Sequence, residues 1–157
     1  MRLWHKDLIN VLPKQQLISQ WRECCCIAQN LASRGTPNHI LVNRILKFPK
    51  CHFSHYTELV VQEIRNRGYN ISLTTYNKFK ENLEQARTNT EFTNSLNNDL
   101  DFILFEGWHD PIYLRQCLYN LEEKAISGGI TQEEWNKIYH KFCNFTPLQD
   151  IVDLKGE

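Results

Sequence analysis

The apolar positions of this chain recur mainly at spacings of three and four residues, the period of an amphipathic α-helix. The clearest such run comes directly after Pro13 and ends before Gly35. Its apolar members are Leu17, Ile18, Trp21, Cys24, Cys25, Ala28 and Leu31. Proline near the start and glycine after the end are typical helix boundaries. The pattern therefore predicts one long helix with a single buried face.

Start and stop residues predict three more helices in the first half, over about 36–49, 54–68 and 73–87. The first prediction rests on Thr36, which can act as an N-cap and is followed by proline. The second rests on Ser54 as a cap and on a closing glycine. These segments leave little room for strands, and no β-hairpin signal is present.

A polar, turn-rich stretch over 87–99 separates these helices from a second group. Asp110 followed by proline predicts a helix that ends at the glycine pair 128–129. Thr131 with Glu134 matches a capping box and predicts a helix to about residue 145. A short last helix is expected to start near residue 146. The predicted fold class is mostly α.

Charge divides the chain in the same place. Residues 1–80 hold 12 Lys/Arg and 4 Asp/Glu, a net charge of +8, whereas residues 81–157 hold 6 and 14, a net charge of −8. We therefore expect a basic helical domain over 1–86 and an acidic helical extension over 87–157, packed against it. A basic half is typical of a polyanion-binding face. The alternative is that the two halves pack together and neutralise each other.

Composition limits the possible cellular locations and cofactors of the protein. The chain has no run of 18 apolar residues and no export signal, so we expect a soluble, cytoplasmic protein that does not contact a membrane. Its six cysteines form no CxxC pair, and we expect no metal site and no cofactor. The one cluster with ligand chemistry is Cys51, His52 and His55, which leaves a metal-dependent hydrolase as one alternative. The oligomeric state stays open.

The first residues suggest chemistry. The chain starts Met1-Arg2-Leu3-Trp4-His5, with apolar residues at once, so we expect an anchored N-terminus. A terminal amine has a reference pKa of about 7.7–8.0, against about 10.4 for lysine. Its uncharged fraction can attack the C1′ carbon of a deoxyribose and form an imine.

Glu23 is the carboxylate that could assist such an amine. It lies in the middle of the first long helix on a polar stripe with Arg22, facing away from the core stripe. A nearby carboxylate can exchange protons and stabilise a cationic intermediate. Taken alone, a helical glutamate is far more often a solvated surface residue.

Three segments of the sequence support a catalytic role for the amine and Glu23. MRLWHKDL, then LPKQQLISQWRECC, and later TELVVQEIRNRGYN resemble the pyrimidine-dimer DNA glycosylase family, the phage-type endonuclease V group, over about residues 1–80. The resemblance implies an all-helical domain that cuts the glycosidic bond of a damaged base. In that family the N-terminal amine is the nucleophile, a glutamate on the first long helix is essential, and arginines hold the phosphates.

Carried over to this chain, the resemblance assigns catalysis to the amine of Met1 and to Glu23. Removal of Met1 is not expected, because the bulky Arg2 follows it. Arg2 and Arg22 would be phosphate-binding arginines, and the third arginine of the family falls at Cys26. The C-terminal segment of the family is replaced here by acidic residues.

The remaining predicted site residues come from the basic half. Arg34, Lys47 and Lys50 are expected to share a DNA-binding face with Arg2 and Arg22. Two further residues, Trp4 and His5, are either substrate contacts or a pair at the edge of the core.

The sequence thus predicts a DNA repair glycosylase with abasic-site lyase activity, working through an imine between the N-terminal amine and C1′. Its partner would be double-stranded DNA that contains a damaged base or an abasic site. The main alternative is a non-catalytic DNA-binding or interaction protein that retains the fold.

Overall fold

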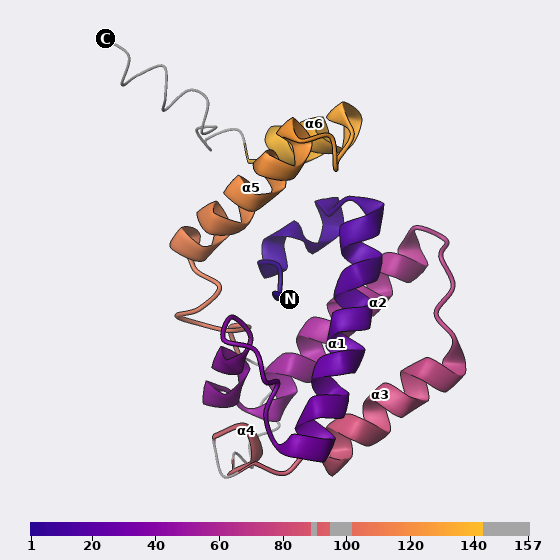
Figure 1. Cartoon of the computed structure of the whole chain (residues 1–157), viewed down its shortest axis with the longest axis vertical. Helices are drawn as coiled ribbons and strands as arrows, with labels where there is room; N and C mark the ends of the chain where they lie inside the picture. Colours follow the sequence, from indigo (N-terminus) through magenta and orange to yellow (C-terminus); the bar gives the residue numbers. More distant parts are fainter. Residues whose placement is uncertain (89–90, 95–101, 143–157) are drawn as a thin grey trace.

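The structure, a computed structural model, describes residues 1–88, 91–94 and 102–142. All the regular elements in these ranges are helical, which confirms the mostly α fold class (Figure 1). Along the chain they are η1 (Lys6–Val11), α1 (Lys14–Arg34), η2 (Asn43–Lys47), α2 (Lys50–Asn66), α3 (Leu73–Gln85), α4 (Glu91–Asn94), α5 (Pro111–Ile126) and α6 (Gln132–Lys141), where η denotes a 3₁₀ helix.

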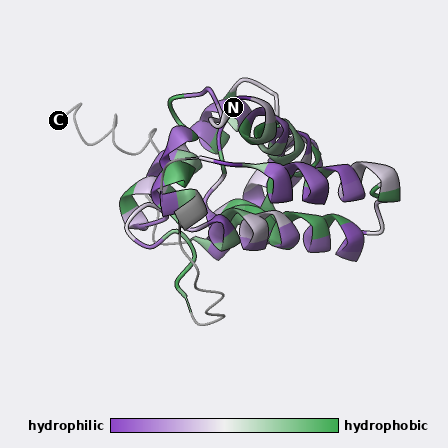
Figure 2. Ribbon diagram, turned by 90° about the horizontal axis from the view of Figure 1, so that it is seen from below, coloured by the Kyte–Doolittle hydropathy of each residue, from purple (hydrophilic) through white to green (hydrophobic). Residues whose placement is uncertain are grey.

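Helices α1, α2 and α3 form the main packed unit, with α1 against both of the others (Figure 1). Aromatic rings join them: Trp21 of α1 and Phe53 of α2 lie 5.7 and 5.9 Å from the ring of Phe79 on α3, centroid to centroid. Figure 2 shows hydrophobic and hydrophilic residues alternating along the helices, as expected where one face of each helix is buried.

Most predicted helix ends are confirmed. Gly35 closes α1 with φ of 70°, a left-handed conformation that glycine adopts without steric cost. Asp110 caps α5 by accepting the backbone N–H of Tyr113 at 2.8 Å. Thr131 and Glu134 form the predicted capping box at α6. The short helix expected near residue 146 lies outside the described residues.

The helix predicted over 36–49 is wrong. Asn38 has φ of 59°, which is incompatible with a continuing α-helix. The hydroxyl of Thr36 accepts the N–H of Asn38 at 3.2 Å, so it closes a turn instead of capping a helix. Only the five-residue η2 forms in this stretch.

The predicted start of the next helix at Ser54 is also wrong, because α2 begins at Lys50. Pro49 directly precedes it, and the Pro49 carbonyl accepts the N–H of His52 at 3.0 Å. Proline is well suited to a helix start, since its missing N–H would have no partner there. The predicted stop is confirmed at Gly68, whose φ is 79°.

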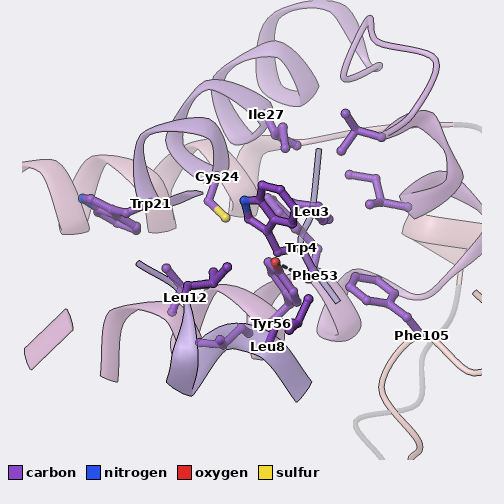
Figure 3. Close-up of a cluster of buried hydrophobic side chains, with 14 of the residues drawn as sticks. Leu3, Trp4, Leu8, Leu12, Trp21, Cys24, Ile27, Phe53, Tyr56 and Phe105 are labelled. Carbon is purple, nitrogen blue, oxygen red and sulfur yellow. Dashed lines mark hydrogen bonds between the residues drawn. The ribbon is translucent and has the colours of Figure 1, made fainter. Parts of the chain in front are cut away.

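The first five residues form an arm without regular structure that crosses the core. Leu3 is fully buried and Trp4 is 7% exposed, in a cluster with Cys24 and Ile27 of α1 and Tyr56 of α2 (Figure 3). The start of the chain is therefore anchored, as expected, although Met1 itself is exposed.

Residues 102–142 add to the same core. Phe105 is fully buried with its ring 5.8 Å from that of Tyr56, and α6 packs against η1. The second group of helices thus packs on the first, as predicted. None of the helices described is both long enough and apolar enough to cross a membrane.

Candidate active site

The arm is held to α1 by the amide of Gln20. This side chain is completely buried, and its two polar atoms face two backbone groups of the arm. Gln20 Oε1 accepts the N–H of Trp4 at 2.8 Å, and Gln20 Nε2 donates to the carbonyl of Arg2 at 3.0 Å. The side-chain amide thus gives the backbone of the arm the two hydrogen bonds that a neighbouring strand would otherwise provide. The arm therefore has a defined position along α1.

Tyr56 of α2 completes this network from below. Its hydroxyl lies 2.7 Å from the carbonyl of Trp4 (Figure 3). It also lies 3.0 Å from Gln20 Oε1, and it can donate its one proton to either oxygen. Burial raises the pKa of Tyr56 well above its ordinary value. The hydroxyl therefore stays protonated and acts as a fixed donor.

Glu23 lies one helical turn after Gln20 and reaches the same arm. Its Oε2 accepts the backbone N–H of Arg2 at 3.2 Å and the side-chain N–H of Gln20 at 3.4 Å. The carboxylate is partly buried. Glu23 is not among the buried residues of α1, as expected, but it is not simply solvated, because the arm lies against this side of the helix.

The α-amine of Met1 is one residue before that N–H. One residue spans at most about 3.6 Å of extended chain, so the amine lies within about 7 Å of Glu23 Oε2. The direct contact of Glu23 is with Arg2 and not with the amine itself. The carboxylate and the amine thus border one small region at the start of the arm.

The opposite side of the arm is held by residues of the acidic half. The hydroxyl of Tyr113 on α5 donates to the carbonyl of Leu3. Before that helix, His109 Nδ1 accepts the N–H of Lys6 at 3.0 Å. The Arg2 guanidinium lies 3.9 Å from the sulfur of Cys117. The site is therefore built from both halves of the sequence.

These opposing residues are neutral. Burial lowers the pKa of His109 to about 2, and the charges of neighbouring basic residues lower it further. Burial raises the pKa of Tyr113 and of Cys117, so both keep their protons near neutral pH. Removing a charged side chain from water without a partner is costly, which favours the neutral form of each.

The predicted DNA-binding residues differ in their surroundings. Arg22, Arg34 and Lys47 are exposed. Arg2 is partly buried, with its guanidinium 5.3 Å from the Trp4 ring. Lys50 is used inside the fold, because its ammonium donates to the carbonyl of Ala86 at 3.1 Å. A common face for all five residues stays a prediction.

Trp4 and His5 are buried, which favours the second of their two interpretations, a pair at the edge of the core. His5 is 2% exposed, and its ring stacks on that of His109 at 5.1 Å. Trp4 supports the Arg2 guanidinium.

The suggested metal ligands do not form a metal site. His52 Nδ1 accepts the N–H of Phe105 at 3.0 Å, and its ring lies 4.2 Å from that of Phe102. Within residues 1–88, 91–94 and 102–142, no group of three or more His, Cys, Asp or Glu side chains could hold a metal ion. The cysteines described there are free.

Sequence reasoning missed Gln20, Tyr113 and Arg44, which here border the arm or a cavity beside it. Gln20 carried one signal: it lies on the apolar stripe of α1, between Leu17 and Cys24, where a polar residue needs a buried partner. Tyr113 carried none, since 110 residues separate it from its acceptor.

Within the described residues the fold is helical, and its N-terminal arm lies against a helix that carries a carboxylate. Residues 1–77 match the family described as pyrimidine dimer DNA glycosylase. The match confirms the resemblance predicted for the N-terminal half and supports a DNA repair glycosylase in general. It stops before α5, so the residues on the opposite side of the arm lie outside it. Searches of curated proteins and of solved structures gave no significant match.

Proposed function

We propose that this protein is a DNA glycosylase with abasic-site lyase activity, with the Met1 amine as nucleophile and Glu23 as acid and base. Its substrate would be double-stranded DNA that carries a damaged base of the pyrimidine-dimer type or an abasic site. The observation that carries the proposal is the 3.2 Å hydrogen bond from the N–H of Arg2 to Glu23 Oε2. It ties the residue next to the amine to the carboxylate.

The proposed chemistry needs only these two groups. The amine lone pair attacks C1′, and the bond between C1′ and the damaged base breaks, with a proton passing to the leaving base. Opening of the sugar ring gives an imine that holds a positive charge. Glu23 then accepts a proton from C2′, and the C3′–O bond breaks with release of the phosphate. The strand is cut by β-elimination, and water frees the amine. No cofactor takes part.

The surroundings suit this role for Glu23. On the α1 side the carboxylate accepts two neutral N–H donors, from the Arg2 backbone and the Gln20 amide, while the Arg2 guanidinium lies on the α5 side at the sulfur of Cys117. A cationic imine formed at Met1 would have Glu23 as its nearby counter-charge, which lowers the cost of the intermediate. Arg2 and the exposed Arg22 would bind phosphates without reading sequence.

Borohydride trapping on DNA with an abasic site tests the proposal. Borohydride reduces an imine to a stable amine, so the untagged protein should form a covalent adduct, and peptide mass analysis should place it on Met1. A protein with a short N-terminal extension should not be trapped, while its helical circular-dichroism spectrum stays unchanged. Equal trapping of the extended protein would overturn the assignment to Met1.

The alternative that the protein binds DNA without catalysis gives a different result. In that case the untagged protein would bind damaged duplex, more weakly as salt rises, but no adduct would form. Binding without trapping would therefore replace the catalytic proposal.

A further inference from the structure

The turn between α1 and η2 presents two aliphatic side chains to solvent. Ile40 is 84% exposed and Leu41 is 48% exposed. Adjacent to them, Val42 and Ile45 are fully buried and fix the base of the turn in the core. Because the base of the turn is packed in the core, the two exposed aliphatic side chains project from an ordered part of the protein.

Hydrogen bonds hold this turn in shape. The N–H of His39 donates to Asn43 Oδ1 at 3.1 Å, and the N–H of Leu41 donates to His39 Nδ1 at 3.3 Å. Asn30 of α1 donates to the carbonyl of Pro37 at 3.2 Å and ties the turn to the long helix. Together with the left-handed Asn38, these bonds give the exposed pair a defined direction before any partner binds.

The exposed pair lies at the edge of a cavity of about 270 Å³. Arg2 and Arg44 line this cavity, with Trp108 and Tyr113 as aromatic walls. The Arg44 guanidinium lies 5.5 Å from the Trp108 ring. No acidic side chain is among the described residues that line it. The described lining of this cavity is therefore basic and neutral, which favours the approach of a polyanion to the turn.

We propose that Ile40 and Leu41 form an apolar wedge that enters the base stack of a DNA duplex beside the lesion. This inference rests on the proposed function. Apolar wedges between base steps unstack and kink duplexes, and enzymes that act on a base must extract it from the stack. Arg2 and Arg44 beside the wedge would hold the phosphates of the opened step. The wedge supplies what the arm cannot, because Leu3 and Trp4 are buried.

The test compares duplex and single-stranded substrates. Three proteins are prepared: the wild type, the double variant Ile40→Ala/Leu41→Ala, and the control Ile126→Ala, which truncates an equally apolar side chain that is 67% exposed at the end of α5. Each is trapped with borohydride on one abasic oligonucleotide, alone and in a duplex. The duplex also carries 2-aminopurine opposite the site, whose fluorescence rises when it unstacks.

A wedge acts only where there is a stack to open. The double variant should be trapped on duplex about 10-fold or more slowly than the wild type, and on the single strand within about twofold of it. The fluorescence rise should be lost in the double variant and kept in the control. Unchanged duplex trapping and fluorescence, or equal losses on both substrates, would overturn the wedge.

Failure of the proposed function looks different. If the wild type is not trapped on either substrate, the lyase proposal fails, and the fluorescence alone decides the wedge. A rise that depends on Ile40 and Leu41 would still support it, and no rise with the wild type would overturn it.

Discussion

The N-terminal arm is held from two sides, and the two sides differ in chemistry. On the α1 side, Gln20 and Glu23 bind backbone groups of the arm with an amide and a carboxylate. On the side of residues 102–126, Tyr113 binds the arm and His109 binds Lys6 directly after it, both with groups that burial keeps neutral. The family match covers only the first side, since it ends at residue 77.

This difference indicates that the two sides of the arm have different roles. A group can exchange protons during a reaction only if both of its protonation states are accessible near the working pH. The shifted pKa values of His109 and Tyr113 make them poor proton carriers near pH 7, whereas Glu23 is the carboxylate that contacts the arm. The α5 side would then position the arm and keep water away from it.

Replacement of Glu23 by glutamine should separate catalysis from binding. The amide can still accept the N–H of Arg2, so the melting temperature should stay close to that of the wild type. It cannot exchange a proton or balance a cationic imine, and strand cleavage should fall by about 100-fold or more. DNA affinity should be equal or tighter, because a negative charge near phosphates is removed.

Gel-based cleavage and fluorescence anisotropy measure the two effects, with Glu81→Gln on the exposed face of α3 as the control. Cleavage by Glu23→Gln at the wild-type rate would mean that the division between the two sides of the arm is wrong.

Gln20→Leu should release the arm on the α1 side. The substitution keeps an apolar side chain of similar size but leaves the buried N–H of Trp4 and the carbonyl of Arg2 without their partner. Unsatisfied buried polar groups cost about 1–3 kcal/mol each, so unfolding should become about 2–3 kcal/mol easier in denaturant titrations. Hydrogen exchange should speed up at Trp4. A cost below about 0.5 kcal/mol would show that the arm is held mainly by the packing of Leu3.

A lower pH should destabilise the folded protein through His109, on the α5 side of the arm. The pKa of His109 is lowered to about 2 in the folded protein, whereas in the unfolded chain it is close to 6.5. Between these values the unfolded chain binds a proton that the folded protein does not. The contribution of His109 to stability is therefore complete above about pH 6.5, and the free energy of unfolding decreases as the pH falls below that value. Burial shifts His5 and His52 in the same direction.

Between pH 7 and pH 5 we expect a loss of about 1–2 kcal/mol, measured by urea titration at each pH. His109→Asn keeps an acceptor for the N–H of Lys6 and cannot titrate, so its stability should decrease less over the same range. The same slope in both proteins would assign the effect to other histidines.

Tyr113→Phe should have the smallest effect. The ring stays in the cavity wall, and the hydroxyl loses its hydrogen bond to the carbonyl of Leu3 and a weaker one with the thiol of Cys117. A single neutral hydrogen bond contributes about 1 kcal/mol, so stability should fall by about that amount and trapping by only a few-fold. Tyr139→Phe on the exposed face of α6 is the matched control. A loss of trapping as large as that of Glu23→Gln would show that the α5 side takes part in the chemistry.

Much of the helical framework could be predicted from local signals. The end of α1 at Gly35, the cap of α5 at Asp110 and the capping box at Thr131 each depend on residues within a few positions of one another. Prediction failed over 36–49 because Thr36 has two local options, a helix cap and a turn, and the buried anchors Val42 and Ile45 favour the turn.

Sequence alone was enough to predict the helical period, most of the helix ends, the resemblance of residues 1–77 to the glycosylase family, and Met1 and Glu23 as candidates. All of these follow from short spacings or short motifs. Tertiary packing alone shows that the arm crosses the core, that Gln20 binds it, and that Tyr113 and His109 contact it from the other half. Helical period tells which face of α1 is buried, but not which segment covers that face. The covering segments lie 16 to 110 residues away from their partners, beyond the reach of any local pattern.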